Sequence, residues 1–163
     1  MEIRKARPED LEQIMPLYAQ ARAFMVATGN PKQWAARNWP PREVIEEDMA
    51  WGKCYVCEDA GELLAVFFYD YGKDIDPSYA VIEDGSWLND EPYGVVHRIA
   101  AKAGSGAGKF CLGWAFDQCG HLRIDTHADN KVMQRTLTKL GFSRRGIVHV
   151  PEDTDTRIAF EKL

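Results

Sequence analysis

The sequence predicts an α/β fold of the α+β type, in which one mixed sheet is flanked by helices. Strand-like and helix-like segments alternate along the chain without internal repeats or low-complexity stretches, a pattern typical of helices packed on a sheet. A β-branched run at 95–101 leads into a glycine-rich loop and then into an amphipathic helix. With 163 residues, 45% hydrophobic and 28% charged, the chain can bury one core but not two, so we expect a single domain over residues 1–163.

The first predicted helix spans residues 8–26. Pro8 suits a first helical position, and the two acidic residues after it complement the helix dipole. Apolar side chains recur on one side of this segment: Leu11, Ile14, Met15, Tyr18 and Met25. A loop over 28–41 and a short second helix over 42–51 are expected to follow.

A β-hairpin is predicted next, with strands at 53–58 and 62–71 joined by the turn Asp59-Ala60-Gly61. The stretch from there to Tyr93 is poorly patterned and acidic, which fits a solvated loop or, alternatively, a surface that attracts a cationic amine. Its acidic residues are Asp74, Asp76, Glu83, Asp84, Asp90 and Glu91. Four tryptophans lie in or beside the irregular segments and are interpreted as anchors or pocket lining: Trp34, Trp39, Trp51 and Trp87.

The second half begins with the strand at 95–101 and the glycine-rich loop. The helix after the loop has one apolar face, with Phe110, Cys111, Trp114 and Ala115, and Gly120 is placed to end it. A strand at 122–127 and a helix opened by Asp129-Asn130 follow. Strands after Phe142 and over 156–160 complete the predicted sheet.

The loop itself predicts an anion site, since three glycines fall within five positions, at Gly104, Gly106 and Gly108. Glycine lets the backbone approach a ligand, and the free N–H groups at a helix start favour a phosphate. A plain surface turn is the alternative. The loop is neither a Walker loop, because Ala103 and Phe110 replace its first glycine and its hydroxyl, nor a dinucleotide fingerprint, because Lys109 replaces the third glycine.

The pair Gly106-x-Gly108 directly after a strand resembles the pyrophosphate loop of the GNAT superfamily of acyl-CoA-dependent N-acetyltransferases, Gln/Arg-x-x-Gly-x-Gly/Ala. Ala103 stands where Gln or Arg is usual, so only the backbone part of the motif is present. The resemblance covers most of the chain and extends to the opening segment Ile3–Asp10, the strand at 122–127, Asn130 and the closing Lys139-Leu140-Gly141-Phe142. It implies a mostly antiparallel mixed sheet in which splayed strands form the slot for an acyl-CoA.

The resemblance also implies where acetyl-CoA binds. The backbone of Ile99 and Ala101 would pair with the pantetheine arm, and Asn130 would bond a pantetheine amide, with a simple helix N-cap as its alternative role. The pyrophosphate would lie against the N–H groups around Gly104, Gly106, Ala107, Gly108 and Lys109.

His97 is the candidate general base. Strand alternation would place it on one face with Ile99 and Ala101, towards the slot. An imidazole with a pKa near 6.5 is mostly neutral at pH 7 and can accept the proton of an attacking amine, directly or through water. Some members of the family carry a histidine on this face, and a hydrogen bond within the sheet is the alternative. Arg98 is expected to face the other way in a structural role.

Three further histidines are ranked below His97: His127 is the second titratable candidate, while His121 and His149 are interpreted as surface or strand residues. No general acid is assigned. Many family members carry a tyrosine three residues before the final Leu-Gly-Phe, near the thioester sulfur, but this position is Leu137 and residues 130–142 contain no tyrosine. A thiolate can leave unassisted, and Tyr69 and Tyr93 are the candidates from outside this helix.

Composition and charge limit the classes of molecule that the chain is expected to bind. A net charge of −5 and a pI near 5.4 argue against nucleic acid and suit an amine substrate. No apolar run approaches the roughly 20 residues that span a bilayer, and no signal peptide precedes the first strand, so no membrane contact and a cytoplasmic location are expected. The cysteines, Cys54, Cys57, Cys111 and Cys119, are expected to be reduced, without a metal.

The sequence therefore predicts an N-acetyltransferase that moves acetyl from acetyl-CoA to an amine of a small molecule or peptide, by direct attack in a ternary complex. A non-catalytic acyl-CoA-binding or sensor domain of the same fold is the alternative. A third hypothesis, a nucleotide-binding α/β domain, would require ATP or NAD to displace CoA. The acceptor amine, and whether the chain acts alone or as a homodimer, are left open.

Overall fold

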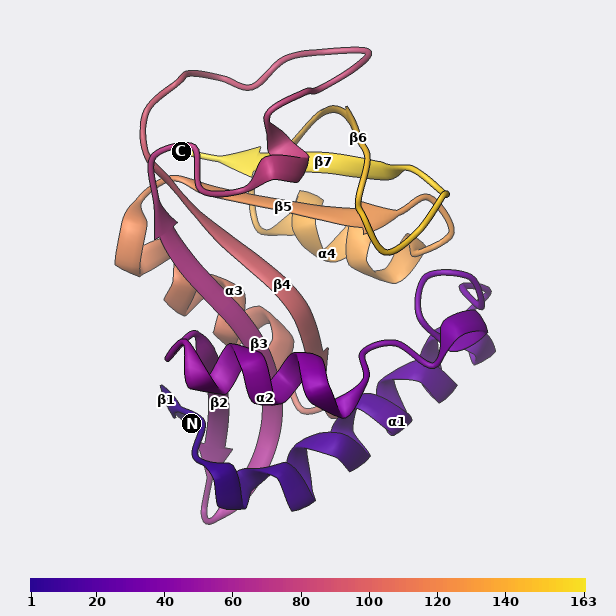
Figure 1. Cartoon of the computed structure of the whole chain (residues 1–163), viewed down its shortest axis with the longest axis vertical. Coiled ribbons are helices and arrows are strands. Elements are labelled where there is room, and N and C mark those ends of the chain that lie inside the picture. The colour runs from indigo at the N-terminus through magenta and orange to yellow at the C-terminus, as the bar shows by residue number, and fades with distance from the viewer.

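The computed structural model describes residues 1–163 and contains a seven-stranded sheet in the order β1-β2-β3-β4-β5-β7-β6. The strands are β1 Glu2–Lys5, β2 Cys54–Asp59, β3 Glu62–Gly72, β4 Tyr93–Ala101, β5 Leu122–His127, β6 Ser143–Val148 and β7 Arg157–Lys162. The helices are α1 Leu11–Ala27, α2 Arg42–Ala50, α3 Ala107–Cys119 and α4 Lys131–Lys139. All neighbouring strands are antiparallel except β4 and β5, which confirms the predicted mixed, mostly antiparallel sheet flanked by helices (Figure 1).

The predicted elements are observed with small shifts at their ends. The first helix begins as a 3-10 turn at Pro8–Asp10 before α1, and the loop after α1 contains a second 3-10 turn at Ala35–Arg37. A third turn, at Pro77–Tyr79, lies in the poorly patterned stretch. Gly120 ends α3 in the left-handed conformation, as its position predicted.

The two faces of the sheet carry separate apolar clusters. On one face, α3 and α4 cover a cluster that includes Phe67, Val96 and Leu112. On the other face, α1 and α2 cover a cluster that includes Ile14 and Ile45. All four cysteines are free, and Cys54 and Cys57 lie in opposite clusters, as alternation along a strand requires.

The strands β4 and β5 separate soon after they pair. Their parallel register comprises only Gly94 with Leu122 and Val95 with Arg123, and the two ribbons then diverge (Figure 1). The remaining length of β4 has no partner on that side. This is the splay that the family resemblance predicted, and it opens the sheet at its middle.

A β-bulge in β4 overturns one sequence expectation. His97 pairs with Phe68 and Ala100 with Val66, so β4 has one residue more than β3 between these pairs. Arg98 fills the extra position with a φ of 50°. The expectation that His97, Ile99 and Ala101 share one face is therefore wrong.

The contacts on each side show the consequence of the bulge. Ile99 and Ala101 pack against the cluster under α3. The His97 ring instead lies 5.7 Å from the Phe68 ring on the opposite face. Arg98, expected to face away from His97, has its guanidinium 4.9 Å from the same Phe68 ring. Both side chains therefore point to the face that carries α2.

The irregular segment 73–92 is held against the sheet by a buried arginine. The Arg123 guanidinium lies 4.2 Å from the Trp87 ring and 4.1 Å from the Tyr93 ring. It also donates to buried Glu161 at 2.9 Å, and Glu161 accepts the backbone N–H of Leu88 at 2.7 Å. This anchoring fixes the segment that carries Asp76, and it identifies Trp87 as an anchor.

Candidate active site

The glycine-rich loop presents free backbone donors at the start of α3. Gly104 and Gly106 both have a φ of 76°, a conformation that glycine adopts without strain. The N–H groups of these two residues, and those of Gly108 and Lys109, donate no hydrogen bond within the chain. The N–H of Ala107 differs, because it donates to the Ser105 hydroxyl at 3.2 Å. Four of the five predicted loop positions therefore offer unpaired donors at the positive end of a helix dipole.

A channel follows β4 between α1 and α4. One cavity of about 150 Å³ is lined by Ile99 and Ala101 of β4 and by side chains of both helices. It adjoins a cavity of about 60 Å³ in the splay of β4 and β5. The two cavities share Met25, Ile99, Asn130 and Met133 in their walls.

Asn130 joins α4 to the segment that follows α1. Its Oδ1 accepts the N–H of Met133 at 3.0 Å, which confirms the N-cap, the alternative given for this residue. Its Nδ2 donates to Gln33 Oε1 at 3.0 Å, and Gln33 Oε1 also accepts from Asn30 at 2.8 Å. The bond from Asn130 to a pantetheine amide stays a prediction.

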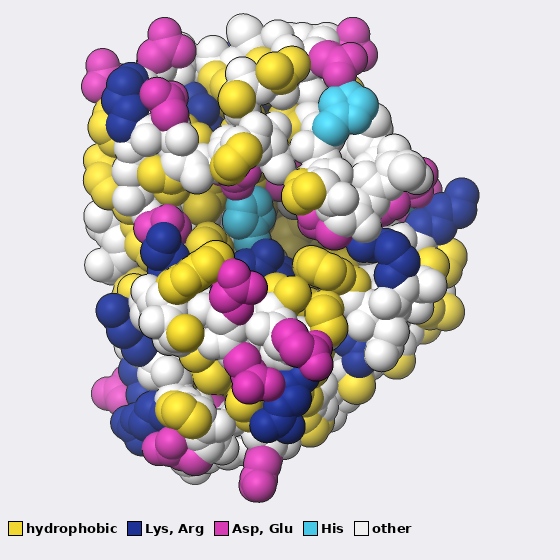
Figure 2. Space-filling view, viewed as in Figure 1, with side chains coloured by type: hydrophobic (Ala, Val, Ile, Leu, Met, Phe, Trp, Pro, Cys, Tyr) yellow, Lys and Arg dark blue, Asp and Glu magenta, His cyan; other side chains and the backbone are white.

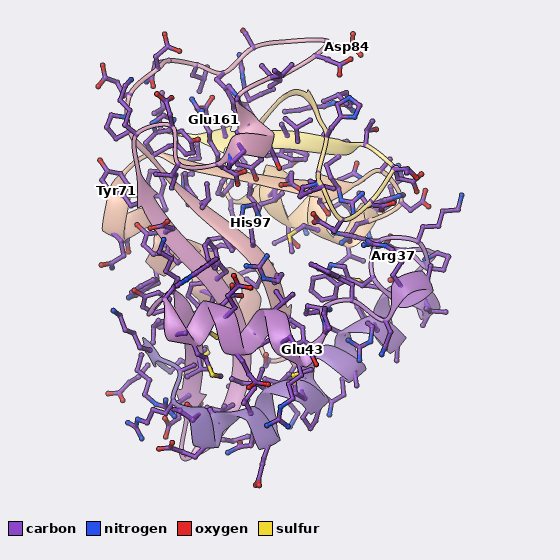
Figure 3. All side chains as sticks on the ribbon, viewed as in Figure 1. Arg37, Glu43, Tyr71, Asp84, His97 and Glu161 are labelled. Atoms are coloured by element: carbon purple, nitrogen blue, oxygen red, sulfur yellow. The ribbon has the colours of Figure 1, made fainter.

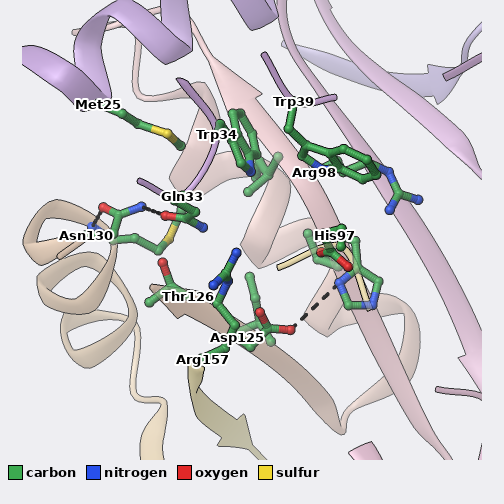
Figure 4. Close-up of a pocket in the computed structure, with 15 residues that line it drawn as sticks. Met25, Gln33, Trp34, Trp39, His97, Arg98, Asp125, Thr126, Asn130 and Arg157 are labelled. Carbon is green, nitrogen blue, oxygen red and sulfur yellow. Dashed lines mark hydrogen bonds and ion pairs between the residues drawn. The ribbon is translucent and has the colours of Figure 1, made fainter. Parts of the chain in front are cut away.

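His97 lies between two carboxylates that come from distant parts of the chain. Its Nε2 is 2.5 Å from Asp76 Oδ2, and its Nδ1 is 4.0 Å from Asp125 Oδ2. Asp125 accepts the Tyr79 hydroxyl at 2.6 Å. Figure 3 places His97 near the centre of the molecule, and Figure 4 shows its ring facing Asp125 across the splay.

The charges of this group shift one another's pKa values. Burial alone would lower the pKa of His97, but the hydrogen bond and charge of Asp76 outweigh it and raise the pKa above 6.5. For Asp76, burial raises the pKa, and the bond to His97 reverses the effect, leaving it below 3.8. Burial dominates at Asp125 and raises its pKa. His97 and Asp76 therefore favour the ion-paired state.

Arg98 is fixed by a buried partner. Its guanidinium donates two hydrogen bonds of 2.9 Å to Asp48 of α2, and its backbone carbonyl accepts the hydroxyl of buried Tyr18 at 2.7 Å. These contacts hold a non-glycine residue at positive φ, which is strained in isolation. They are consistent with the structural role predicted for Arg98.

A larger cavity of about 460 Å³ lies on the side of His97 away from the channel. His97, Arg98, Asp125 and Glu152 line both this cavity and the small one in the splay. The remaining walls mix acidic and polar with apolar and aromatic groups: Asp70, Asp76, Ser78, Ile75, Phe68, Trp51, Pro77, Val95, Val150 and Pro151. Figure 2 shows this face hollowed near its centre, with a histidine at the floor of the hollow, where Figure 3 labels His97.

The other titratable candidates lie elsewhere. His127 pairs with Asp155 at 2.9 Å, and with Asp153 it forms a group that could hold a metal ion. Arg157, however, already pairs with Asp153 at 3.0 Å. His121 is buried against Glu161 at 2.6 Å and lies just before β5, so it is neither a surface nor a strand residue.

The two tyrosines proposed from outside α4 do not line the three cavities. Tyr69 packs against Trp114 on the α3 face. The Tyr93 hydroxyl accepts the N–H of Asp76 at 3.2 Å and so supports the loop beside His97. The tyrosine that does contact the candidate site is Tyr79.

Sequence reasoning missed the partners of His97 and the amide at the splay. Asp76 is one of six acidic residues that fit either a solvated loop or a surface that attracts an amine, and Gln33 and Tyr79 lie in segments without a periodic pattern. Only Asp125 could have been found from the sequence. It lies on the strand that diverges from β4, and its position alternates with the core residues of that strand, which indicates a side chain on the opposite face.

Comparisons with known proteins agree with this geometry. A family model described as "Acetyltransferase (GNAT) domain" matches residues 1–143. A solved GNAT-family acetyltransferase from Streptococcus agalactiae matches with a TM-score of 0.88 and 32% identity, over 99% of this chain and 94% of the other. A putative acetyltransferase from Staphylococcus aureus matches with a TM-score of 0.70 and 26% identity, over 99% and 98% of the two chains.

A more distant match shows the fold alone. The ribosomal-protein-alanine N-acetyltransferase from Brucella melitensis matches with a TM-score of 0.62 and 16% identity, over 100% of this chain and 99% of the other. No curated protein sequence matches. None of the helices has the length and apolar character needed to span a bilayer.

Proposed function

Because this chain belongs to the GNAT family of acetyltransferases, we propose that residues 1–163 form one domain that transfers acetyl from acetyl-CoA to an amine. The amine attacks the thioester directly in a ternary complex. One observation carries the proposal. The channel along β4 adjoins the small cavity in the splay, and His97 lines both that small cavity and the larger one.

The donor would occupy the channel. The free N–H groups of Gly104, Gly106, Gly108 and Lys109 would bind the pyrophosphate, helped by the dipole of α3. The pantetheine arm would extend along the backbone of β4 past Ile99 and Ala101, which line the channel with Asn130. The thioester would then reach the splay, where the channel adjoins the small cavity.

His97 would act as the general base. Its Nε2 hydrogen donates to Asp76, so the lone pair of the neutral ring is on Nδ1, the nitrogen that faces Asp125 and the splay. An amine that has lost its extra proton to solvent attacks from there, and it gives a second proton to Nδ1 while its nitrogen forms a bond to the carbonyl carbon. The C–S bond then breaks and the electron pair leaves on the CoA thiolate.

The acceptor would occupy the larger cavity. Asp70, Asp76, Asp125 and Glu152 line it, and carboxylates attract an amine that arrives protonated. Aromatic and apolar walls at Trp51 and Phe68 would contact its carbon skeleton. A small-molecule or peptide amine fits this lining.

No side chain of α4 would protonate the leaving thiolate, because the position usual for tyrosine is Leu137, which is fully buried. The thiolate is a sufficient leaving group to depart unassisted, so a slow enzyme is expected. Tyr79 donates to Asp125 and therefore stabilises the carboxylate beside His97 rather than the sulfur.

Thiol release from acetyl-CoA, measured over a panel of amines, amino acids and peptides, tests the proposal. Turnover that depends on one class of amine supports it. Binding of CoA without turnover by any amine would instead identify the non-catalytic acyl-CoA-binding domain. Displacement of CoA by ATP or NAD would contradict both.

A further inference from the structure

The amide group of Gln33 can be oriented from its hydrogen bonds. The backbone N–H of Met133 donates to Asn130, so the atom that receives it must be Oδ1 and the other atom of that amide must be Nδ2. Nδ2 is a donor only, so the Gln33 atom that it contacts at 3.0 Å must be Oε1. Asn30 donates to the same oxygen at 2.8 Å. The network thereby fixes Nε2 on the opposite side of the Gln33 amide.

Gln33 Nε2 has no hydrogen-bond partner in the chain, although the residue is only 9% exposed. It lines the cavity of about 60 Å³ in the splay, and Figure 4 shows the amide nitrogen directed away from Asn130 into that cavity. An amide N–H that lies in a cavity wall without a partner in the chain is free to donate to a ligand there.

A second unpartnered polar group lies in the same wall. Thr126 of β5 is 1% exposed, and its Oγ1 has no hydrogen-bond partner. Threonine hydroxyls in buried strands normally bond a neighbouring carbonyl. Figure 4 shows the Thr126 hydroxyl directed towards the Gln33 amide. Two potential donors from separate segments thus face one small space.

Charged groups of both signs surround this space, because Asp125 and Glu152 line the cavity along with Arg98 and Arg157. The buried Arg157 lines the same cavity, and its guanidinium lies beside Thr126 in Figure 4. The cavity adjoins the channel along β4 on one side and His97 on the other. The cavity of about 60 Å³ is the smallest of the three that meet around His97 and the channel.

We propose that Gln33 Nε2 and Thr126 Oγ1 donate hydrogen bonds to the carbonyl oxygen of the acetyl thioester, so that both are catalytic residues. The inference rests on the proposed acetyl transfer and deepens it. When the amine nitrogen bonds to the carbonyl carbon, the C=O electron pair moves to oxygen, and both donors stabilise the oxyanion. When the C–S bond breaks, the double bond reforms and the thiolate takes the electron pair.

Thr126→Val is the cleanest test, because valine keeps the shape and removes only the hydroxyl. That hydroxyl makes no bond in the free protein, so the variant is expected to fold and melt like the wild type or slightly higher. Loss of one oxyanion donor lowers kcat by about 100-fold in other enzymes, and we expect a fall of at least tenfold here. Thr138→Val, on the exposed part of α4, is the matched control and leaves kcat unchanged.

Gln33→Glu tests the second donor. A carboxylate still accepts from Asn30 and Asn130, and these donors favour its ionised form. The atom that faces the cavity becomes an acceptor, which repels the oxyanion. We expect kcat to fall about 100-fold at mildly alkaline pH, with CoA affinity within about twofold of the wild type.

Infrared spectra of bound acetyl-CoA labelled with ¹³C at the carbonyl give a readout that needs no amine. Two donors should shift the C=O stretch of wild-type complexes to lower frequency, and each variant should reverse part of that shift. Bound acetyl-CoA with an unshifted band overturns this inference and leaves the proposed acetyl transfer standing. Wild-type protein that binds no acetyl-CoA overturns both, and unchanged kcat in stable Thr126→Val excludes the role of that hydroxyl.

Discussion

Gly108→Val and Gly106→Val together distinguish a glycine that a bound ligand requires from a glycine that the backbone conformation requires. Gly108 has ordinary helical φ, and an added Cβ would meet only the Ala101 Cβ at 3.6 Å, an ordinary contact. Gly106 differs, since its φ of 76° would cost roughly 1–2 kcal/mol in any other residue. At about 2–4 °C per kcal/mol for a chain of this size, Gly106→Val should lower Tm by about 2–8 °C. Gly108→Val should leave Tm near that of the wild type.

The same variant should weaken CoA binding at least tenfold, which is about 1.4 kcal/mol, because a branched side chain keeps a pyrophosphate away from the free N–H groups. Titration calorimetry with CoA and thermal melts on the same samples measure both quantities. Gly113→Val is the matched control, since Gly113 lies on the exposed side of the same helix with nothing within 4 Å of an added Cβ. A folded Gly108→Val protein that binds CoA like the wild type would refute the assigned pyrophosphate site.

Three further outcomes are expected. His97→Gln should lower kcat by roughly 100-fold while CoA affinity stays nearly unchanged, and wild-type turnover in that variant would rule out the base. The acidic limb of the wild-type kcat/KM profile should lie above pH 6.5, because Asp76 outweighs the opposing effect of burial on the His97 pKa. Asp76→Asn should therefore move that limb to lower pH, and an unmoved limb would show that another group titrates. Asp48→Ala leaves the half-buried Arg98 guanidinium without its buried partner and should lower the free energy of unfolding in urea by about 3 kcal/mol. Glu62→Ala, which removes an exposed ion pair, should cost under about 1 kcal/mol, and equal losses would contradict the role given to burial.

Local signals predicted most of the fold and the free backbone donors of the glycine loop. The glycine loop, the N-cap at Asn130 and the end of α3 at Gly120 each depend on a few neighbouring residues, so sequence alone located them. The partners of His97 could not be found this way. Asp76 reaches His97 across 21 positions of the chain, through a segment that Arg123 anchors from another strand. Such partners depend on tertiary packing rather than on periodicity.

The bulge in β4 explains why strand alternation predicted the wrong face for His97. Strict period-two geometry would place His97 with Ile99 and Ala101, on the apolar face under α3. An imidazole there would have no carboxylate partner and would be driven towards its neutral form by burial. The extra residue turns His97 to the face with Asp76 while Ile99 and Ala101 keep theirs. No glycine marks the position, because the contacts of Arg98 with Asp48 and Tyr18 hold its positive φ in place. In the proposed ternary complex, one strand would then present its backbone to the donor and its histidine to the acceptor.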